Sequence, residues 1–361
     1  MNTKLNTEPT VDMSKVEAFA GQVVTDIAAA FSGVMTNIGH KLGLYKAMAG
    51  AGPLSSKNLA NLTGTHERYI REWLNNQVAG QYVSFHAGTG LYELPAENVP
   101  VLADDESPFF LVPALDVASS LWLDEGKVTS VFKSGEGIAW SEHHHRLFCG
   151  SEALFRPGYK AHLSASWISS LDGVEEKLRA GAKVADVGCG HGASTIVLAG
   201  EFPNSTFVGI DSHQESIDIA RRRSTEAGVG GNTQFVVATA KEYADKDFDL
   251  ICFMDCLHDM GDPVGAAAHA RSALKGDGSI LLVEPAANDQ LQNNINPVSR
   301  LYYAASTAVC TPCSLSQEVG LGLGAQAGQL RLTEVMKEAG FAETRRAAET
   351  PFNIVLDVRI G

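Results

Sequence analysis

The sequence predicts an α/β protein: a seven-stranded, mostly parallel sheet that ends in an antiparallel hairpin, preceded by a smaller, mainly helical domain. Three observations predict this fold. From residue 181 onward, short apolar runs of strand length alternate with helical segments, which is typical of a parallel sheet covered on both faces. Near the C-terminus, two strand patterns follow each other with no helix between them, which indicates a hairpin. Before residue 100, apolar residues recur mainly at helical spacing.

Length and composition narrow the classes of protein that this chain can be. With 361 residues it suits two domains, and 45% hydrophobic residues are enough for a folded core. The formal charge of −14 and the lack of a basic tail make a nucleic acid an unexpected partner. No stretch approaches the roughly 20 apolar residues of a membrane helix, and the N-terminus lacks the apolar core of a signal peptide. Because the chain has only six cysteines, we expect no disulfide framework and a cytoplasmic protein. Because we expect no membrane segment, we also expect no membrane partner.

Residues 14–100 predict a winged-helix domain. Apolar spacing from Val16 to about Met48 indicates a long first helix. A short helix begins near Ser55, and a second, capped by Thr65, spans His66–Ala79. Strand patterns at 81–85 and 91–94 flank a turn. Helix, turn, helix and β-wing together form a winged-helix module.

Two roles are open for this module. Its second helix could enter a DNA groove, but residues 1–100 carry seven Lys or Arg against eight Asp or Glu, and Glu67 and Glu72 lie beside Arg68 and Arg71. The charge balance therefore favours a packing or dimerisation domain. Because the first helix is so apolar, we expect it to cover another surface, and we expect a homodimer.

The remaining chain divides into a connecting region and the α/β domain. Residues 101–180 are acidic and predict a helical linker and cap, with helices around 109–133 and 153–179. Residues 181–361 predict the sheet, with an irregular cap insertion at about 286–328. Helices are expected at 193–199, 214–228, 263–274 and 329–339. Strands are expected at 183–187, 206–210, 233–238, 248–254, 278–284, 343–349 and 352–359.

A glycine-rich loop carries the first chemical signal. Gly188, Gly190 and Gly192 lie between a strand and a helix, where glycines let the backbone approach a ligand and the helix N-terminus offers free N–H groups. Asp186 precedes the loop. Asp211 ends the next strand, where its carboxylate can accept hydrogen bonds from both hydroxyls of a ribose.

The segment Asp186-Val-Gly-Cys-Gly-His-Gly192, with Gly209-Ile-Asp211, resembles the class I S-adenosylmethionine-dependent methyltransferases. In that family the terminal hairpin distinguishes the Rossmann-like sheet from a dinucleotide-binding one. With its winged-helix front end, the whole chain is similar to bacterial small-molecule O-methyltransferases and, more distantly, to plant-type O-methyltransferases.

The resemblance implies S-adenosylmethionine as the cofactor. The glycine loop, with Asp186, would contact its methionine part, and Asp211, with Ser212, would hold the ribose. Thr239 and Ala240 would flank the adenine, and Asp255 and Cys256 would line the floor of the cleft.

A second segment, His258-Asp-Met-Gly-Asp262, indicates the catalytic base. It resembles the His-Asp-Trp-x-Asp stretch of the plant-type enzymes, whose histidine takes the proton of the acceptor hydroxyl, except that Met260 replaces the tryptophan. A neutral imidazole, with a pKa of about 6.5, can do this at neutral pH. Glu284, at the end of a strand, would orient the histidine. The alternative is that His258 packs in the core and Glu284 points into solvent.

Two other groups could suggest a metal, but we expect none. The run His143-His144-His145 lies in one stretch, and adjacent residues rarely face one ion together. Cys310-Thr-Pro-Cys313 has the spacing of a redox or zinc motif, but two cysteines alone cannot close a zinc site. Asp255 and Asp259 are conceivable magnesium ligands, although a histidine base makes a metal unnecessary.

The sequence therefore predicts an S-adenosylmethionine-dependent methyltransferase that acts on a small organic acceptor, most simply on a hydroxyl oxygen rather than on nitrogen or carbon. The 130–160 segment, the first helix and the 286–328 insertion, with Tyr302 and Tyr303, are the expected walls of an apolar acceptor pocket. An S-adenosylmethionine-sensing winged-helix transcriptional regulator is the alternative function, and binding of a different nucleotide is a second one.

Overall fold

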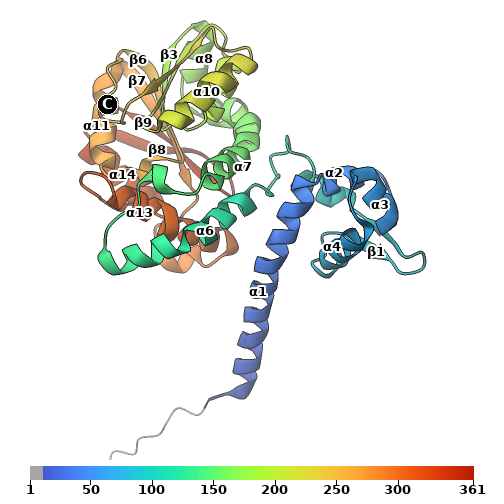
Figure 1. Ribbon diagram of the computed structural model, residues 1–361. Helices are drawn as coiled ribbons and strands as arrows, with labels where there is room; N and C mark the ends of the chain where they lie inside the picture. The colour runs from blue at the N-terminus through green and yellow to red at the C-terminus, as the bar shows by residue number, and fades with distance from the viewer. Residues whose placement is uncertain (1–10) are drawn as a thin grey trace, which may run out of the picture. The chain divides into compact units, whose positions relative to one another are not determined.

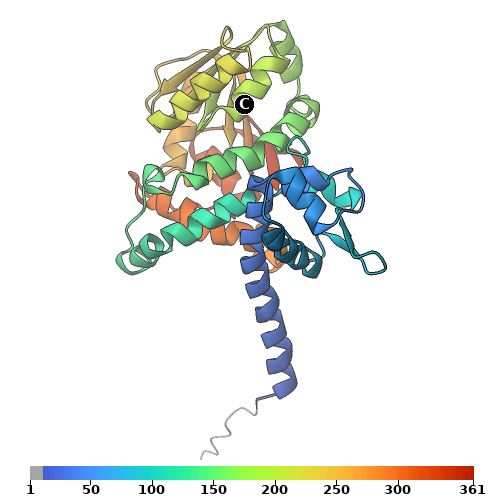
Figure 2. The ribbon, with the colours of Figure 1, turned by 45° about the vertical axis from the view of Figure 1, so that its right-hand side comes forward.

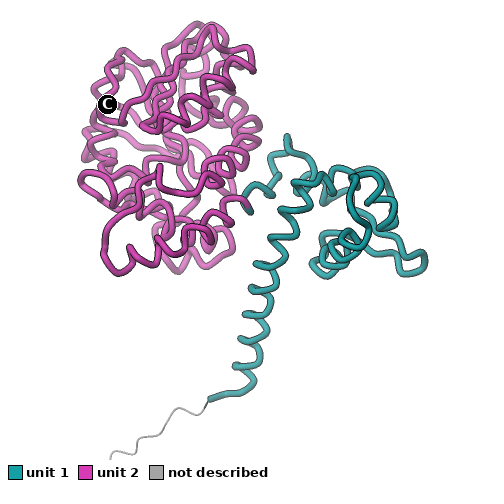
Figure 3. Tube along the Cα trace, in the orientation of Figure 1, with its two compact units in different colours: residues 1–115 teal, residues 116–361 magenta. Residues whose placement is uncertain are grey.

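The computed structural model describes residues 11–361, and the chain divides after Leu115 into two compact units (Figure 3). Unit 1 ends at Leu115 and unit 2 spans Asp116–Gly361.

The helices of unit 1 begin and end at local sequence signals. Helix α1 spans Met13–Lys41 with Asp12 as N-cap, and Gly43, in the left-handed conformation, separates it from α2 (Leu44–Met48). Helix α3 spans Ser56–Thr63 and begins where predicted, with Ser55, one of the two serines that could cap it, as the N-cap. Helix α4 spans Glu67–Ala79 and is capped by the ring of His66, which accepts from the Arg68 N–H, whereas Thr65 was the predicted cap. The unit ends in the short helices η1 (Ala96–Asn98) and α5 (Val99–Leu102).

A hairpin and one apolar core complete unit 1. Strands β1 (Ser84–His86) and β2 (Leu91–Glu93) pair antiparallel and form the predicted wing. The C-terminal end of α1 packs closely on α4, because a Cβ atom added at Gly39 would lie 2.5 Å from the Trp73 ring. The core of the unit consists of buried apolar side chains, among them Leu44, Tyr45, Met48, Leu59, Ile70, Trp73 and Leu74.

The rest of α1 exposes its apolar side chains. Val16, Phe19, Val23, Ile27, Phe31 and Val34 are all exposed in the single chain. By length and composition α1 could cross a membrane, so the expectation that no stretch has these properties is wrong. The sequence obscured this because Asp26 and several polar or small residues interrupt the run of apolar side chains.

Unit 2 contains a seven-stranded sheet in the order β5-β4-β3-β6-β7-β9-β8. Strands β3 to β7 pair in parallel, whereas β9 pairs antiparallel with both β7 and β8, which confirms the predicted terminal hairpin. The strands are β3 (Lys183–Val187), β4 (Thr206–Asp211), β5 (Thr233–Val237), β6 (Phe248–Met254), β7 (Leu274–Pro285), β8 (Glu343–Glu349) and β9 (Asn353–Arg359).

Helices cover both faces of this sheet (Figures 1 and 2). On one face, side chains such as Val187 and Phe253 pack against α11 (Pro263–Ala273) and α14 (Gly328–Glu338). On the other face, the alternate residues of the same strands pack against a second set of helices. This set comprises α7 (Arg146–His162), the π-helical turn η3 (Leu163–Trp167), η4 (Ile168–Ser170), α8 (Val174–Ala180) and α9 (Ala193–Glu201). Helix α10 (Gln214–Glu226) packs beside β5 through Ile217 and Ala220.

Further helices lie beyond the carboxyl edge of the sheet. Helix α6 (Ala114–Ser134) and the turn η2 (Trp140–Glu142) precede α7. The segment 286–328 was expected to be irregular, but much of it is helical. It contains η6 (Leu291–Asn294), α12 (Pro297–Ala305), the π-helical turn η7 (Ser306–Cys310) and α13 (Thr311–Leu315). These helices are short, and two of them have a proline in their first turn. The sequence therefore shows no long helical repeat of apolar residues in this segment.

Candidate active site

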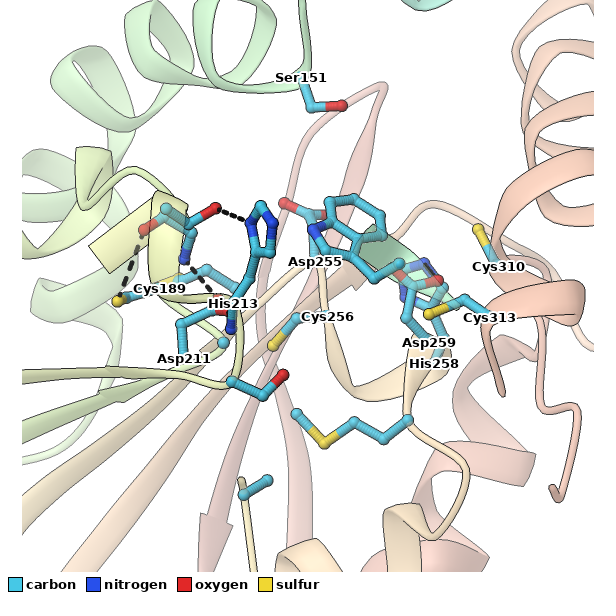
Figure 4. A pocket seen from close by; sticks show the side chains of 18 of the residues that line it. Ser151, Cys189, Asp211, His213, Asp255, Cys256, His258, Asp259, Cys310 and Cys313 are labelled. Atoms are coloured by element: carbon cyan, nitrogen blue, oxygen red, sulfur yellow. Dashed lines mark hydrogen bonds and ion pairs between the residues drawn. The ribbon is translucent and has the colours of Figure 1, made fainter. Parts of the chain in front are cut away.

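A cavity of about 700 Å³ opens where β3, β4, β6 and β7 end. Its wall includes the last residues of these strands, Val187, Asp211, Met254 and Pro285, together with residues of α7 and of the helical 286–328 segment. In Figure 4, Asp211 and His213 lie at one end of the cavity, and His258, Asp259, Cys310 and Cys313 lie at the other. The carboxyl edge of a parallel sheet is the usual ligand site of such folds.

The three glycines of the loop serve different purposes. All three have a positive φ. At Gly188 a Cβ atom would lie 2.7 Å from Cys256 Sγ, and at Gly192 it would lie 2.9 Å from the Phe235 ring, so packing within the protein requires these two glycines. At Gly190 a Cβ atom would meet nothing within 4 Å, and this residue lines the cavity. The open space beside Gly190 is where a ligand can approach the backbone.

Asp186 lies beneath the loop and does not line the cavity. Its Oδ2 accepts hydrogen bonds from the hydroxyls of Ser194 (2.6 Å) and Thr195 (2.5 Å) in the first turn of α9. Its Oδ1 is buried without a partner among the described residues. Burial raises the pKa of Asp186 above its usual value. This carboxyl thus ties the loop to the helix that follows it.

Asp211 lines the cavity and is held by the loop itself. Its Oδ2 accepts a hydrogen bond from the Gly190 N–H (2.9 Å), and its Oδ1 accepts one from the His213 N–H (2.8 Å). Burial raises the pKa of Asp211. Each oxygen keeps further acceptor capacity, because an ionised carboxylate has about four acceptor sites.

The three other predicted cofactor contacts along this edge also line the cavity: Ser212, Thr239 and Ala240. Thr239 donates its hydroxyl to Glu242 (2.8 Å), and the backbone N–H of Ala238 donates to the Asp211 carbonyl (3.0 Å). The end of β5 is thereby fixed beside the end of β4.

Asp255 and Cys256 form part of the cavity wall, as expected from the resemblance. Asp255 has φ 52°, an uncommon conformation for a residue other than glycine. The Asn353 amide donates to its Oδ1 (2.7 Å) and the Tyr159 hydroxyl to its Oδ2 (3.1 Å). Burial, followed by the charge of Glu284, raises the pKa of Asp255 to about 7. The Cys256 thiol donates to the Val187 carbonyl under the glycine loop (3.0 Å).

His258 and Glu284 form a buried pair. Glu284 lies behind the cavity wall, where its Oε1 accepts the Leu257 N–H (3.0 Å) and its other oxygen bonds to Nδ1 of His258. Glu284 therefore does not point into solvent. Burial lowers the pKa of His258, but the carboxylates of Glu284 and Asp259 outweigh burial and raise this pKa above its ordinary value. The pKa of His258 is therefore shifted, contrary to the expectation from the sequence.

Asp259 and two cysteines surround the other side of the His258 ring (Figure 4). Asp259 Oδ1 lies 3.3 Å from His258 Nε2. One ligand atom from each of His258, Asp259 and Cys310 lies within 4.8 Å of the other two. Burial raises the pKa of Cys310 to about 12, and Cys313 lines the same cavity.

The expected acceptor walls are present in part. Trp140, Phe148 and Phe155, from the 130–160 segment, and Tyr302, from the insertion, line the cavity, whereas Tyr303 does not. None of the three consecutive histidines lines it. His143 is instead buried against Asp124, with its Nδ1 3.3 Å from Oδ2.

Sequence reasoning missed the residues that hold the site from a distance. Tyr159 and Asn353 are 96 and 98 residues from Asp255 in the chain. Ser194 and Thr195, which hold Asp186, are near in sequence, and their position in the first helical turn was the signal that could have identified them.

Comparison with known proteins agrees with this geometry. Residues 178–340 match the model of a methyltransferase domain family, and residues 30–104 match an Rv2258c-like winged HTH domain. A fatty-acid O-methyltransferase of Mycolicibacterium smegmatis is 35% identical over 80 residues, which is 22% of this chain. The chain spans 28% of the length of that relative.

Solved structures of similar fold cover nearly the whole chain. A candidate O-methyltransferase from Nostoc punctiforme has a TM-score of 0.70 at 17% identity and covers 97% of this chain and 100% of its own. Human N-acetylserotonin methyltransferase, solved in complex with SAM, has a TM-score of 0.66 at 16% identity and covers 98% of this chain and 99% of its own. At these identities the likeness concerns the fold. Together with the two family matches, it shows that residues 178–340 form a methyltransferase domain and residues 30–104 a winged helix-turn-helix domain.

Proposed function

We propose that this protein transfers the methyl group of S-adenosylmethionine to a hydroxyl oxygen of a small organic acceptor. The observation that carries the proposal is the carboxylate of Asp211. It lines the cavity, is fixed by the N–H of Gly190, and keeps acceptor sites for two ribose hydroxyls. Ser212, beside it, and Thr239 and Ala240 at the end of β5 would surround the rest of the adenosine.

The methionine part of the cofactor would lie against Gly190, where the loop backbone faces open space. Asp186, Gly188 and Gly192 support this position indirectly, since the carboxyl holds the first turn of α9 and the two glycines let the loop pack. The sulfonium is already reactive, so the protein's main contribution is to align acceptor oxygen, methyl carbon and sulfur and to exclude water.

We propose His258, in its neutral form, as the group that takes the acceptor's proton. Because the pKa of His258 is raised, the neutral form, and with it turnover, should increase as pH rises through that pKa. It lines the cavity, and the bond from Nδ1 to Glu284 directs Nε2 away from the strand. Glu284 stabilises the imidazolium that forms when the ring accepts a proton, as an orienting carboxylate does in other histidine bases. Glu284 is thus a positioning residue, because it touches the ring rather than the cavity.

The acceptor is proposed to be hydrophobic or aromatic. Aromatic side chains line the cavity from three elements: Trp140 from η2, Phe148 and Phe155 from α7, and Tyr302 from α12. A pocket with mainly apolar walls and few polar groups binds ligands of matching character.

The test is a pair of measurements on the purified full chain. Calorimetric titration with S-adenosylmethionine and, separately, with NAD distinguishes the proposed cofactor from another nucleotide. Incubation of small-molecule extracts with methyl-labelled S-adenosylmethionine, followed by mass spectrometry, identifies the acceptor and the methylated atom. Binding of NAD without binding of S-adenosylmethionine would refute the proposal.

The winged-helix domain is proposed to pack or dimerise rather than to read DNA. On α4, Arg68 pairs with Glu72 (2.6 Å) and Arg71 with Glu67 (2.7 Å), so the arginines that phosphates would need already have carboxylate partners. A transcriptional regulator would bind random duplex DNA with an affinity that falls steeply as salt is added. We expect no such binding.

We propose that a second copy of this chain covers α1 and that the protein is a homodimer. Apolar residues repeat along α1 at intervals of three and four, as at Val16, Phe19, Val23 and Ile27, and this pattern suits a helix that pairs with another helix. Light scattering at micromolar concentration should give twice the chain mass. A monomer that floats with lipid vesicles would instead assign α1 to a membrane.

The six free cysteines support a reducing compartment, the cytoplasm, as the site of action.

A further inference from the structure

The first part of the connection between α13 and α14 (Figure 1), residues 316–321, is a strap that belongs to no helix or strand. Ser316, Gln317 and Glu318 in this strap line the cavity. Val319 and Leu321, by contrast, are 68% and 39% exposed. The strap therefore separates the cavity from solvent here without the regular hydrogen bonds of a helix or a sheet.

The backbone of the strap is strained at Val319. Its φ is 72°, and for a β-branched residue this left-handed conformation is a genuine outlier. Such strain persists only where surrounding contacts impose it, and it is found at ligand clamps and switch segments. Gly320 and Gly322 also have a positive φ, which glycine adopts without this cost. Within the strap the strain is thus confined to Val319, and the glycines allow the backbone to turn when its contacts are released.

Gly261 holds the strap on both sides of Val319. Its N–H donates to Gln317 Oε1 (3.1 Å), and its carbonyl accepts a hydrogen bond from the Leu321 N–H (2.8 Å). A Cβ atom at Gly261 would lie 2.5 Å from the Gln317 Cβ. Only a glycine therefore lets the strap approach this loop so closely.

The ammonium of Lys241 joins the strap to a fixed helix end. Its Nζ lies 3.0 Å from Glu318 Oε2 and 3.0 Å from Asp262 Oδ2. Asp262 is fixed because its other oxygen caps α11 by accepting the Gly265 N–H (2.8 Å), whereas the Glu318 side chain is 83% exposed. Lys241, Asp262 and Glu318 all line the cavity. The two ion pairs therefore hold the strap in place directly beside its strained residue.

We propose that the strap is a gate between the cavity and solvent, held closed by Lys241 and opened when Glu318 leaves the ammonium. Opening returns Val319 to an extended backbone, so the strain favours the open state and the contacts at Gly261 and Lys241 favour the closed one. A gate that closes over a ligand excludes water and retains the ligand. Lys241 is a positioning residue. The gate follows from the contacts of the strap, whereas its action on S-adenosylmethionine rests on the proposed function.

The first test is hydrogen exchange, followed by mass spectrometry, of the full chain without ligand, as wild type, Lys241→Met and the control Lys275→Met. Lys275 also pairs with a carboxylate, that of Asp249 (2.8 Å), but lies outside the cavity lining. In Lys241→Met the amides of residues 316–322 should exchange about 2–10-fold faster, because two ion pairs are lost, and in Lys275→Met they should not change. Equal exchange in Lys241→Met, or an equal rise throughout the chain, would overturn the proposal.

Gly261→Ala tests the same gate from the opposite side. The new Cβ atom displaces Gln317, so residues 316–322 should exchange at least about tenfold faster while the unfolding temperature stays near that of the wild type, because the strap moves aside. A lower unfolding temperature with unchanged exchange at the strap would mean that the strap is a rigid part of the wall, and the gate would be refuted.

The second test measures binding kinetics by stopped-flow fluorescence of Trp140, which lines the cavity, with S-adenosylmethionine as the probe. In Lys241→Met the association and dissociation rates should rise together, by about 2–10-fold, because the gate opens more often. Equal rates in wild type and variant would overturn the gate. Rates that change in opposite directions would also overturn it, since they would indicate only the lost positive charge. Failure of S-adenosylmethionine to bind would refute the proposed function, while hydrogen exchange would still decide whether the strap opens.

Discussion

Asp211 accepts a hydrogen bond from the backbone N–H of Gly190 at 2.9 Å, so the carboxylate at the end of β4 and the glycine loop after β3 form one connected surface. Adjacent parallel strands bring these two chain segments together at the carboxyl edge of the sheet. A change at Asp211 should therefore alter both cofactor binding and the position of the loop.

Replacing Asp211 by alanine should weaken S-adenosylmethionine binding by about 1–3 kcal/mol, the value of one to two hydrogen bonds to a charged group. Calorimetry with S-adenosylmethionine measures the change directly. Asp218→Asn is the matched control, because Asp218 is an exposed carboxylate on α10. Unchanged affinity in Asp211→Ala would show that the cofactor lies elsewhere.

The His258–Glu284 pair leads to a prediction about proton transfer. In Glu284→Gln, the amide oxygen can still accept the Leu257 N–H, but the amide NH₂ can only donate to Nδ1 of His258. The ring would then carry its proton on Nε2 and lose its accepting nitrogen on the cavity side. Turnover should fall by about 10²-fold or more, as in His258→Ala.

Cofactor affinity is the discriminating readout for this pair. Both variants should bind S-adenosylmethionine like the wild type, because neither side chain contacts the proposed cofactor region. The effect of the double variant on turnover should be much smaller than the product of the two single effects, since the residues act as one unit. Multiplicative effects would mean that Glu284 acts on something other than the histidine.

The local signals in the sequence predicted the fold well. Strand β3 and strand β6 coincide with their predicted ranges, because short apolar runs bounded by glycine and aspartate leave little choice of ends. The helices α12 and α13 were missed because neither is longer than 9 residues, and a helix of fewer than three turns shows no clear period.

The site was predictable only where its residues belong to one local motif. Asp211 and His258 were found because each follows a strand at the ligand-binding edge. The partners Asn353, Tyr159 and Cys310 reach the site through the topology of the sheet and the 286–328 helices, and no spacing in the sequence encodes that proximity.

Asp255 should make stability depend on pH. Its pKa is raised from 3.8 to about 7 in the folded protein. Between these values the folded state binds a proton that the unfolded state has lost, so the free energy of unfolding falls as pH rises, by up to about 1.4 kcal/mol per pH unit. Above about pH 7 both states are ionised and this slope ends.

The isosteric variant Asp255→Asn should remove that slope. Asparagine tolerates the positive φ and can still pair with Asn353 and Tyr159. Urea unfolding from pH 4.5 to 8 should therefore show the variant gaining on the wild type as pH rises toward 7. Asp172→Asn, at a carboxyl that is 94% exposed, is the control. A constant difference between Asp255→Asn and wild type would show that Asp255 titrates normally in the folded chain.

The two loop glycines Gly188 and Gly190 should respond differently to alanine. Gly188→Ala places a Cβ atom 2.7 Å from Cys256 Sγ and forces an L-residue into φ 77°, so strain and overpacking together should cost about 2–4 kcal/mol of unfolding free energy. Gly190→Ala meets no atom within 4 Å and should cost only the conformational strain, about 1–2 kcal/mol.

The order should reverse for the cofactor. A methyl group at Gly190 projects into the cavity where the methionine part of S-adenosylmethionine is proposed to lie, so Gly190→Ala should lower affinity more than its small effect on stability suggests. Thermal unfolding and calorimetric titration of the same two samples separate these quantities. If Gly190→Ala binds the cofactor like the wild type, the cofactor does not approach the loop at this residue, and the proposed position of its methionine part is wrong.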